Sequence, residues 1–506
     1  MSVHKTIPLL IFLVFGLGSE SRALADYAKK ETHFEGVVQL AKRLSEKPFK
    51  APKSRLPDAV RDLDYDGYRK IIWRPDKSLW KDDDLNFRLE FFHPGYLFKN
   101  PVKLNEFSDS HVQTIPFTSE FFDYGDLDLN PRRISRQAYY AGFRLLFPLN
   151  EGDKFDEVLS FLGASYFRAL GVGHRYGKSA RGLALNTGLN QPEEFPIFRE
   201  FWIGKPDYQS VDVRLFGLLD SPSVAGAYQF DVRPGKDTLI EVKAVLFFRQ
   251  TVDWLGICPL TSMYWYGENS SGNHQDFRPE VHDSDGLMIE AEEGTIWRAL
   301  VNDGRKRNFV HEGAGIRRFG LMQRDRNFDH YQDLEAWYQA RPSVWIEPKE
   351  GMAAGSIQLI EFPTDNEYFD NIVAAWVPDE MPALESPYPV AYSLHWSSDN
   401  VTAAPLARVV STRFGKNQDG QSGTRFVVEF TQPANQTEWL PDSIKADFTG
   451  SNPASITGVK VLHNSLDSRW RIVFLVQGSA PADLACRLLY EGELISEIWS
   501  YPWNPN

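Results

Sequence analysis

Two acidic segments of the sequence carry side chains that could perform acid–base chemistry. Residues 278–286 read Arg-Pro-Glu-Val-His-Asp-Ser-Asp-Gly, and residues 363–371 read Pro-Thr-Asp-Asn-Glu-Tyr-Phe-Asp-Asn. Hydrolysis of a glycosidic bond needs one protonated carboxyl group for the leaving oxygen and one ionised carboxylate that activates water or attacks carbon. The rings of Tyr368 and Phe369 could shield a neighbouring carboxyl group from water, and such desolvation favours its protonated form. The alternative is that these acids are solvated, or cap backbone amides in turns.

Other catalytic and ligand-binding motifs are incomplete in the sequence. Residues 171–179 resemble a phosphate-binding loop, but Val172 stands where that motif needs its first glycine, so we interpret them as a glycine-rich turn between strands. The run Asp283-Ser-Asp-Gly lacks the distal ligands of a calcium loop. The 11 histidines and 2 cysteines show no zinc-ligand spacing, and no Gly-x-Ser-x-Gly elbow occurs. We therefore expect no metal and no cofactor.

The composition excludes some classes of protein. Lys+Arg number 55 and Asp+Glu number 68, a formal net charge of −13 that argues against nucleic-acid binding. Aromatic residues make up 14% of the chain, which suits either the cores of large sheets or stacking against sugar rings. We expect the two cysteines, Cys258 and Cys486, to be buried thiols and not a disulfide.

The first 25 residues have the pattern of a cleaved export signal. Lys5 gives a positive start, Ile7–Leu17 is apolar, and Ala23-Leu-Ala25 is a small-x-small cleavage site. The apolar run is too short to span a bilayer comfortably, and no arginine pair precedes it. We expect a soluble periplasmic protein exported by the general secretory route, with the mature chain beginning at Asp26.

The elements that would position the acids are mostly strands. A capping-box spacing from Thr32 to Glu35, followed by apolar residues at helical spacing, predicts one amphipathic helix that ends before Pro48. Residues 228–232 and 238–248, separated by Pro-Gly-Lys, predict a long hairpin.

Further strand signals run through the first part of the chain. Arg136–Phe147 predicts another strand, and Asp333–Gln339 predicts a short helical patch. Many strands separated by Gly/Pro turns over roughly 350 residues predict a large antiparallel β-sandwich.

A proline-rich stretch, Pro378–Pro389, predicts an extended linker between domains. The segments after it that favour strands are Ala391–Trp396, Thr424–Phe430, Ile456–Leu462, Trp470–Val476 and Leu484–Tyr490. Their number and spacing fit an immunoglobulin-like sandwich. We therefore expect a signal peptide at 1–25, a large sandwich at 26–385 and a C-terminal domain at 386–506.

The sequence resembles the periplasmic glucan biosynthesis proteins of the G and D type, which act on osmoregulated periplasmic glucans. The resemblance covers nearly the whole mature chain. The segments that carry it are Leu162–Arg168, Ser179–Leu183, Glu194–Pro196, Glu200–Trp202, Leu219–Pro222, Pro259–Met263, His282–Ser284, Arg341–Ser343 and Asp370–Val373 leading to Trp376.

The resemblance implies a large galactose-mutarotase-like β-sandwich followed by a smaller immunoglobulin-like one. It also implies an anomer-inverting endo-β-1,2-glucanase, in which Asp370 matches the general acid. Asp283 matches the general base, acting through a relay of waters and substrate hydroxyls. Tyr338, Arg341 and Glu367 match residues that line the site. For these three residues, a packed ring, a structural ion pair and a solvated turn acid remain alternatives.

Other functions stay open at this point. The cleft could guide nascent glucan from an inner-membrane glucosyltransferase without cleaving it, or could transfer glucan chains by transglycosylation. An epimerase is suggested by architecture alone, which is a weak warrant for function.

Overall fold

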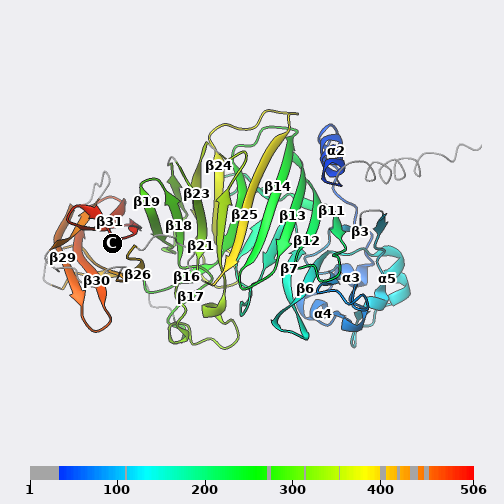
Figure 1. Cartoon of the computed structure of the whole chain (residues 1–506), viewed down its shortest axis with the longest axis horizontal. Helices are drawn as coiled ribbons and strands as arrows, with labels where there is room; N and C mark the ends of the chain where they lie inside the picture. The colour runs from blue at the N-terminus through cyan, green and yellow to red at the C-terminus, as the bar shows by residue number, and fades with distance from the viewer. Residues whose placement is uncertain are drawn as a thin grey trace, which may run out of the picture.

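The protein is known from a computed structural model that describes residues 33–505 except 109–110, 271–274, 313–314, 353, 399–405, 419–421, 433–442 and 449–454. The predicted export signal lies outside the described residues. Strands dominate the fold, which confirms the prediction of a mainly β protein built from sandwiches (Figure 1).

Two large sheets form the body of the molecule. The first sheet has ten strands and the second has fifteen, and most neighbouring strands in each are antiparallel. Along the main path of the first sheet the order is β2 (Arg88–Phe92), β6 (Gly142–Glu151), β7 (Lys154–Leu162), β8 (Tyr166–Ala169), β9 (Ser179–Arg181), β15 (Leu255–Ser262), β24 (Ile372–Pro378), β23 (Gly355–Glu361) and β20 (Arg307–His311). The central strands of the second sheet are β18 (Gly286–Ala291), β21 (Arg318–Met322), β22 (Ser343–Pro348), β25 (Tyr388–Ser397), β14 (Thr238–Phe248), β13 (Val224–Arg233), β12 (Val213–Asp220) and β11 (Ile197–Gly204).

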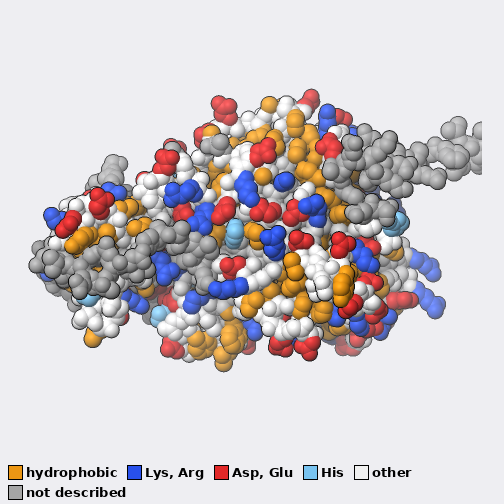
Figure 2. All heavy atoms as spheres, viewed as in Figure 1, with side chains coloured by type: hydrophobic (Ala, Val, Ile, Leu, Met, Phe, Trp, Pro, Cys, Tyr) orange, Lys and Arg blue, Asp and Glu red, His pale blue; other side chains and the backbone are white. Residues whose placement is uncertain are grey.

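One continuous apolar core joins the two sheets. It contains Phe143 and Phe161 from the first sheet and Tyr228, Phe230 and Trp396 from the second, all buried. Phe161 and Phe230 meet across it with ring centroids 5.1 Å apart. Buried apolar area is the main stabilising contribution in such a core. Acidic and basic side chains are interspersed over the solvent face seen in Figure 2.

The predicted N-terminal helix is confirmed as α2 (His33–Ser45). Its buried residues Val37 and Ala41 pack on Phe216, Ala227 and Phe247 of the second sheet, so the helix covers the face of β12–β14 that points away from the core. The predicted hairpin is also confirmed, because β13 and β14 pair along their whole lengths, from Val224↔Phe248 to Arg233↔Leu239.

The strand predicted at Ala391–Trp396 exists as β25. It pairs with β14 on one side and β22 on the other and therefore lies inside the large sheet. The proline-rich stretch is the connection from β24 to β25. The division of the chain at 385/386 stays a prediction, and the pairing of β25 favours a boundary after Ser397.

The strands after residue 405 enclose a second core. One layer is a four-stranded sheet of β26 (Val409–Lys416), β27 (Thr424–Phe430), β30 (Arg469–Gln477) and β29 (Ser455–Asn464). The other layer, β28 (Ile444–Phe448), β31 (Ala482–Tyr490) and β33 (Ile498–Trp503), continues the large sheet because β33 pairs in parallel with β19 (Gly294–Ala299). The four strand predictions between residues 424 and 490 are confirmed.

Two smaller predictions need correction. Arg136 lies in a helix, α5 (Pro131–Gln137), and the strand begins only at Gly142, because Asn130 caps the backbone N–H of Arg133 and so starts a helix. The helical patch at Asp333–Gln339 is mainly turns, with one 3₁₀ turn, η4 (Tyr338–Ala340).

Both cysteines are buried and unpaired, as predicted. Among the described helices, none combines the length and the apolar character that a membrane crossing requires.

Replacing Trp396 by alanine tests the place of β25 in the large sheet. Trp396 is fully buried in the core between the sheets. We expect Trp396→Ala to lower the free energy of unfolding by about 3–5 kcal/mol, because a large cavity remains. Trp396→Phe, which keeps a ring, should lose less. Urea denaturation measures both, and a loss below 1 kcal/mol for the alanine variant would contradict this packing.

Candidate active site

The five site residues predicted from the sequence lie in loops at one end of the large sandwich. Asp283 lies between β17 (Val281–His282) and β18, while Tyr338 opens η4 and Arg341 follows it. Glu367 and Asp370 lie in the loop between β23 and β24. The loops come from both large sheets, so the fold brings together residues that are far apart in sequence.

A hydrogen-bonded clamp at Met263–Tyr264 fixes the two acidic loops to each other. Asn371 is fully buried beside Asp370, and its amide accepts from the N–H of Tyr264 at 2.8 Å. It donates to the carbonyls of Tyr264 at 3.0 Å and Phe362 at 2.9 Å. One residue earlier, the carbonyl of Met263 accepts from the N–H of Asp283 at 2.8 Å. The clamp therefore ties the two loops that carry Asp283 and Asp370 to one short backbone segment, Met263–Tyr264.

Asp283 is buried and paired with Arg341. The side chain of Asp283 is 5% exposed, and its Oδ1 contacts Nη1 of Arg341. The guanidinium also donates to the carbonyl of Ala336 at 3.2–3.3 Å and lies 4.2 Å from the ring centre of Tyr338. A guanidinium in contact favours the negatively charged form of a carboxyl group. The structure thus joins three of the five predicted residues through Arg341.

Lys178 holds the Asp283 loop from behind, and no sequence signal identified it. It lies in the glycine-rich turn between β8 and β9, and its buried ammonium group donates to the carbonyls of Asp283 and, at 2.6 Å, Pro342. Burial lowers the pKa of Lys178 to about 7. Residues 171–179, which resemble a phosphate-binding loop, therefore support the site from inside the protein.

Glu367 is held by two neighbours and is not a solvated turn acid. The hydroxyl of Tyr338 donates to its Oε2, and Arg278 donates to the same oxygen at 2.9 Å. Arg278 also pairs with Asp276 at 2.7 Å and Asp333 at 2.9 Å. Arg278 belongs to the first acidic segment, yet its role depends on contacts across 55 and 89 residues, which composition cannot reveal.

Asp370 occupies a different environment from Asp283. It is partly buried and lines a pocket of about 730 Å³, and its carboxyl group makes no hydrogen bond with the part of the chain that the structure describes. Burial raises the pKa of Asp370, and the negative charge of Asp283 raises it further. Arg168, Arg181 and Arg341 oppose this shift. The net effect favours a protonated Asp370.

The rings beside Asp370 in sequence do not enclose it. Tyr368 is 91% exposed and Phe369 is 49% exposed, so the proposed desolvation by these two rings is wrong. The pocket wall is built instead from β7 and β8 with the turn after β8, and it includes Tyr166 and Tyr176. Arg181 lies 4.7 Å from the ring centre of Tyr166. Aromatic faces beside guanidinium groups suit the apolar faces and hydroxyls of a sugar.

One described group could offer three ligand atoms to a metal. Atoms of Glu280, Asp325 and His330 lie within 4.8 Å of one another. His330 forms a hydrogen bond with Asp325, and the carboxylate of Glu280 accepts a hydrogen bond from His282 at 2.8 Å. Since these contacts already engage the group, it carries no cofactor prediction.

Comparison with known proteins gives consistent matches. Residues 32–503 match the family described as "Periplasmic glucan biosynthesis protein, MdoG". Glucans biosynthesis protein G of Ralstonia nicotianae is 40% identical over 479 residues, covering 92% of this chain and 94% of that protein. The proteins of the same name from Rhodopseudomonas palustris and Pectobacterium atrosepticum are 38% and 39% identical over 471 and 480 residues; coverage is 93% of both chains for the first and 92% for the second.

Substitution of Asn371 tests the clamp. Asn371→Asp keeps the oxygen that accepts from the N–H of Tyr264 but loses the amide N–H groups. The backbone carbonyls of Tyr264 and Phe362 therefore lose this donor. We expect Asn371→Asp to lower the free energy of unfolding by about 2–4 kcal/mol. Asn366→Ala, in the same loop, serves as the matched control and should change stability little. Equal stability of the two variants in urea denaturation would show that the clamp does not hold the loops.

Proposed function

The chain belongs to the family of periplasmic glucan biosynthesis proteins, and from that premise we propose that it cleaves β-1,2-linked glucan as an inverting endo-acting glycoside hydrolase. The linkage and the stereochemistry follow from the family resemblance of the acidic segments. The observation that supports the proposal most directly is the contrast between two neighbouring carboxyl groups. Asp370 is partly buried without a hydrogen bond from the described residues, and Asp283 is paired with Arg341.

Asp370 is the general acid in this proposal. A carboxyl group whose pKa is raised by burial and by a nearby negative charge keeps its proton to a higher pH than an exposed carboxyl group does. In the reaction it donates that proton to the oxygen of the leaving sugar, which departs as a neutral alcohol. The open pocket beside Asp370 leaves room for the glycosidic oxygen to approach.

Asp283 is the general base, acting through a relay. Its side chain is 5% exposed, which leaves little surface for a water that must also reach the anomeric carbon. A chain of a water and a sugar hydroxyl can carry the proton to a buried carboxylate. Inverting enzymes separate the two carboxyl groups by roughly 6.5–9.5 Å to admit water, and a relay permits a longer gap.

Tyr338, Arg341 and Glu367 shape the site around the acids. Arg341 forms an ion pair with Asp283, while Tyr338 supports Arg341 through its ring and binds Glu367 through its hydroxyl. The Glu367 carboxylate is thereby held in place in the loop that carries Asp370. Its remaining lone pairs can accept from sugar hydroxyls.

Replacement of the acid gives the direct test. We expect Asp370→Asn to slow the shortening of linear β-1,2-glucan by about 10²–10⁴-fold while glucan binding persists, because the amide cannot donate the proton. Asp365→Asn, an exposed neighbour in the same loop, is the matched control. An anomer-resolved NMR time course follows the wild-type products, which should appear as the inverted anomer.

Other outcomes of that experiment assign other functions. Cleavage by Asp370→Asn at the wild-type rate would contradict the acid assignment. Binding without any wild-type product would favour a guiding role beside a membrane glucosyltransferase. The formation of glucan chains longer than the substrate, without a fall in the total number of glycosidic bonds, would favour a transglycosylase.

The pH dependence of the rate offers a second test. The acid must be protonated, so activity should fall as the pH rises through the raised pKa of Asp370. Arg168 lowers that pKa, so we expect Arg168→Gln to raise it and to move the alkaline limb of kcat to higher pH. A shift to lower pH, or no shift, would contradict the electrostatic account.

A further inference from the structure

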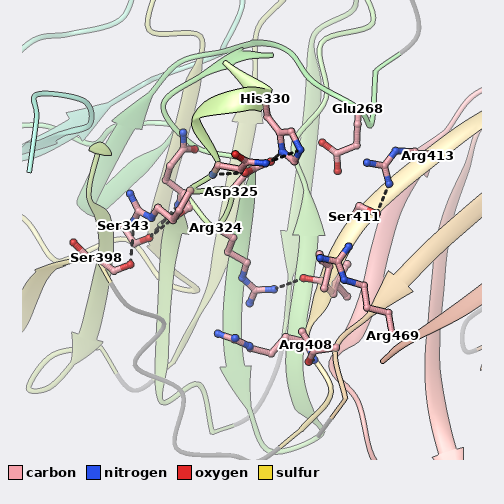
Figure 3. A pocket seen from close by; sticks show the side chains of 16 residues that line it. Glu268, Arg324, Asp325, His330, Ser343, Ser398, Arg408, Ser411, Arg413 and Arg469 are labelled. Atoms are coloured by element: carbon pink, nitrogen blue, oxygen red, sulfur yellow. Dashed lines mark hydrogen bonds and ion pairs between the residues drawn. The ribbon is translucent and has the colours of Figure 1, made fainter. Parts of the chain in front are cut away.

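A second pocket, of about 460 Å³, lies between the large sandwich and the C-terminal strands (Figure 3). It shares no lining residue with the pocket of Asp370. On one side are the ends of β21 and β22 with the turn that follows β21, and on the other are β26 and the start of β30. Val409 and Val410 are the only apolar residues among the described ones that line it, so a hydrophobic ligand would find little to contact.

One wall of this pocket is basic. It carries Arg408, which directly precedes β26, Arg413 on β26 and Arg469 at the start of β30 (Figure 3). The carboxylate nearby is Glu429, which accepts from Arg471 at 3.0 Å. Glu429 lies 3.5 Å from Arg413 and 3.7 Å from Arg469, which is too long for strong hydrogen bonds. Arg469 also lies 3.3 Å from Asp467, so carboxylates engage the guanidinium groups of Arg413 and Arg469 only in part.

The guanidinium of Arg408 has fewer partners than those of Arg413 and Arg469. The backbone N–H of Arg408 donates to Thr431 at 2.9 Å, but its exposed guanidinium forms no hydrogen bond or ion pair with the residues that the structure describes. The hydroxyl of Ser411 lies on the same wall and accepts from Arg413 at 2.7 Å. Three guanidinium groups thus lie beside two carboxylates, Glu429 and Asp467, and Glu429 is also paired with Arg471.

The opposite wall does not neutralise this charge. Burial and contact with Glu280 raise the pKa of Glu268 well above its usual range, which favours a neutral carboxyl group. Asp325 is paired with His330. Arg324 forms a bidentate pair with Glu497 at 2.7 and 2.8 Å, so this pair adds no net charge. The negative charge of Asp325 is offset by Arg326, which lines the same wall and donates to the backbone carbonyl of Gln339 at 2.9 Å. The pocket is a local positive site in a chain whose formal net charge is −13.

We propose that this pocket binds a phosphate group, either as inorganic phosphate or as the monoester of a small polar molecule. Guanidinium groups present planar pairs of donors that match phosphate oxygens, and such charge-assisted bonds are about twice as strong as neutral ones. The volume falls within the range of small-molecule sites and exceeds what a lone phosphate fills. The site is independent of the proposed glucan cleavage.

Isothermal titration calorimetry of the full chain tests the proposal. The probes are inorganic phosphate and glucose 6-phosphate, with glucose as the neutral control. We expect both phosphates to bind, with an affinity that falls as salt rises, and glucose not to bind at this site. Binding of inorganic phosphate alone would restrict the site to the free anion. Failure of both phosphates to bind would overturn the proposal.

Variants locate the binding. We expect Arg408→Gln to weaken phosphate binding by about tenfold or more, and Arg408→Lys to weaken it less, because lysine keeps the charge but not the paired donors. Arg214→Gln, an exposed arginine on β12 that pairs with Asp231, is the matched control and should leave the Kd unchanged. Thermal denaturation curves check that both proteins are folded. Equal Kd values for folded wild type and folded Arg408→Gln would place the phosphate elsewhere and overturn the assignment.

Discussion

The clamp around Met263–Tyr264 is the constraint on which the rest of the site depends. Strand β15 runs through the first large sheet and pairs with β24 up to the register Ser262↔Ile372. At that point the chain leaves the sheet, and its next two residues bond to Asp283 and Asn371. The pairs Leu260↔Ala374, Thr261↔Val373 and Ser262↔Ile372 fix the relative position of the two strand ends. The positions of two loops therefore follow from the end of one strand pair.

The electrostatics of the acids follow from where the clamp places them. Asp283 sits inside, against Arg341 and over the buried ammonium group of Lys178, whereas Asp370 sits at the edge of an open pocket. Each charge influences the other, because the ionised Asp283 raises the pKa of Asp370. Two carboxyl groups of similar intrinsic acidity thus lie in different environments, and acid–base catalysis on a glycosidic bond requires such a difference.

Local patterns predicted the elements whose backbone hydrogen bonds join residues close together in the sequence. Helix α2 and the β13–β14 hairpin follow from apolar periodicity and a turn, and both are present. The proline run, predicted as an extended linker, contains bends and a turn at residues 384–385. Its surroundings are fixed by β25 pairing with β14, about 150 residues earlier, which no local signal reveals.

In the candidate site too, the sequence predicted local features but not those that depend on residues far apart in the chain. The sequence drew attention to both acidic segments, and the family resemblance selected Asp283 and Asp370 among their acids. It did not identify Lys178, Arg278 or Asn371, because each acts on backbone or side-chain atoms far away in the sequence. Tyr368 and Phe369 were expected to bury an acid, yet the enclosing wall comes from β7 and β8. Burial depends on tertiary packing, so neighbours in sequence are a poor guide to it.

The central claim is that the two carboxyl groups form one electrostatically coupled pair. The most direct measurement is a ¹³C-carboxyl NMR titration of Asp370 in the wild type and in Asp283→Asn. The account predicts that the wild-type pKa of Asp370 lies above the usual 3.8 and falls when the charge of Asp283 is removed. A normal wild-type pKa, or one that does not change in the variant, would contradict it.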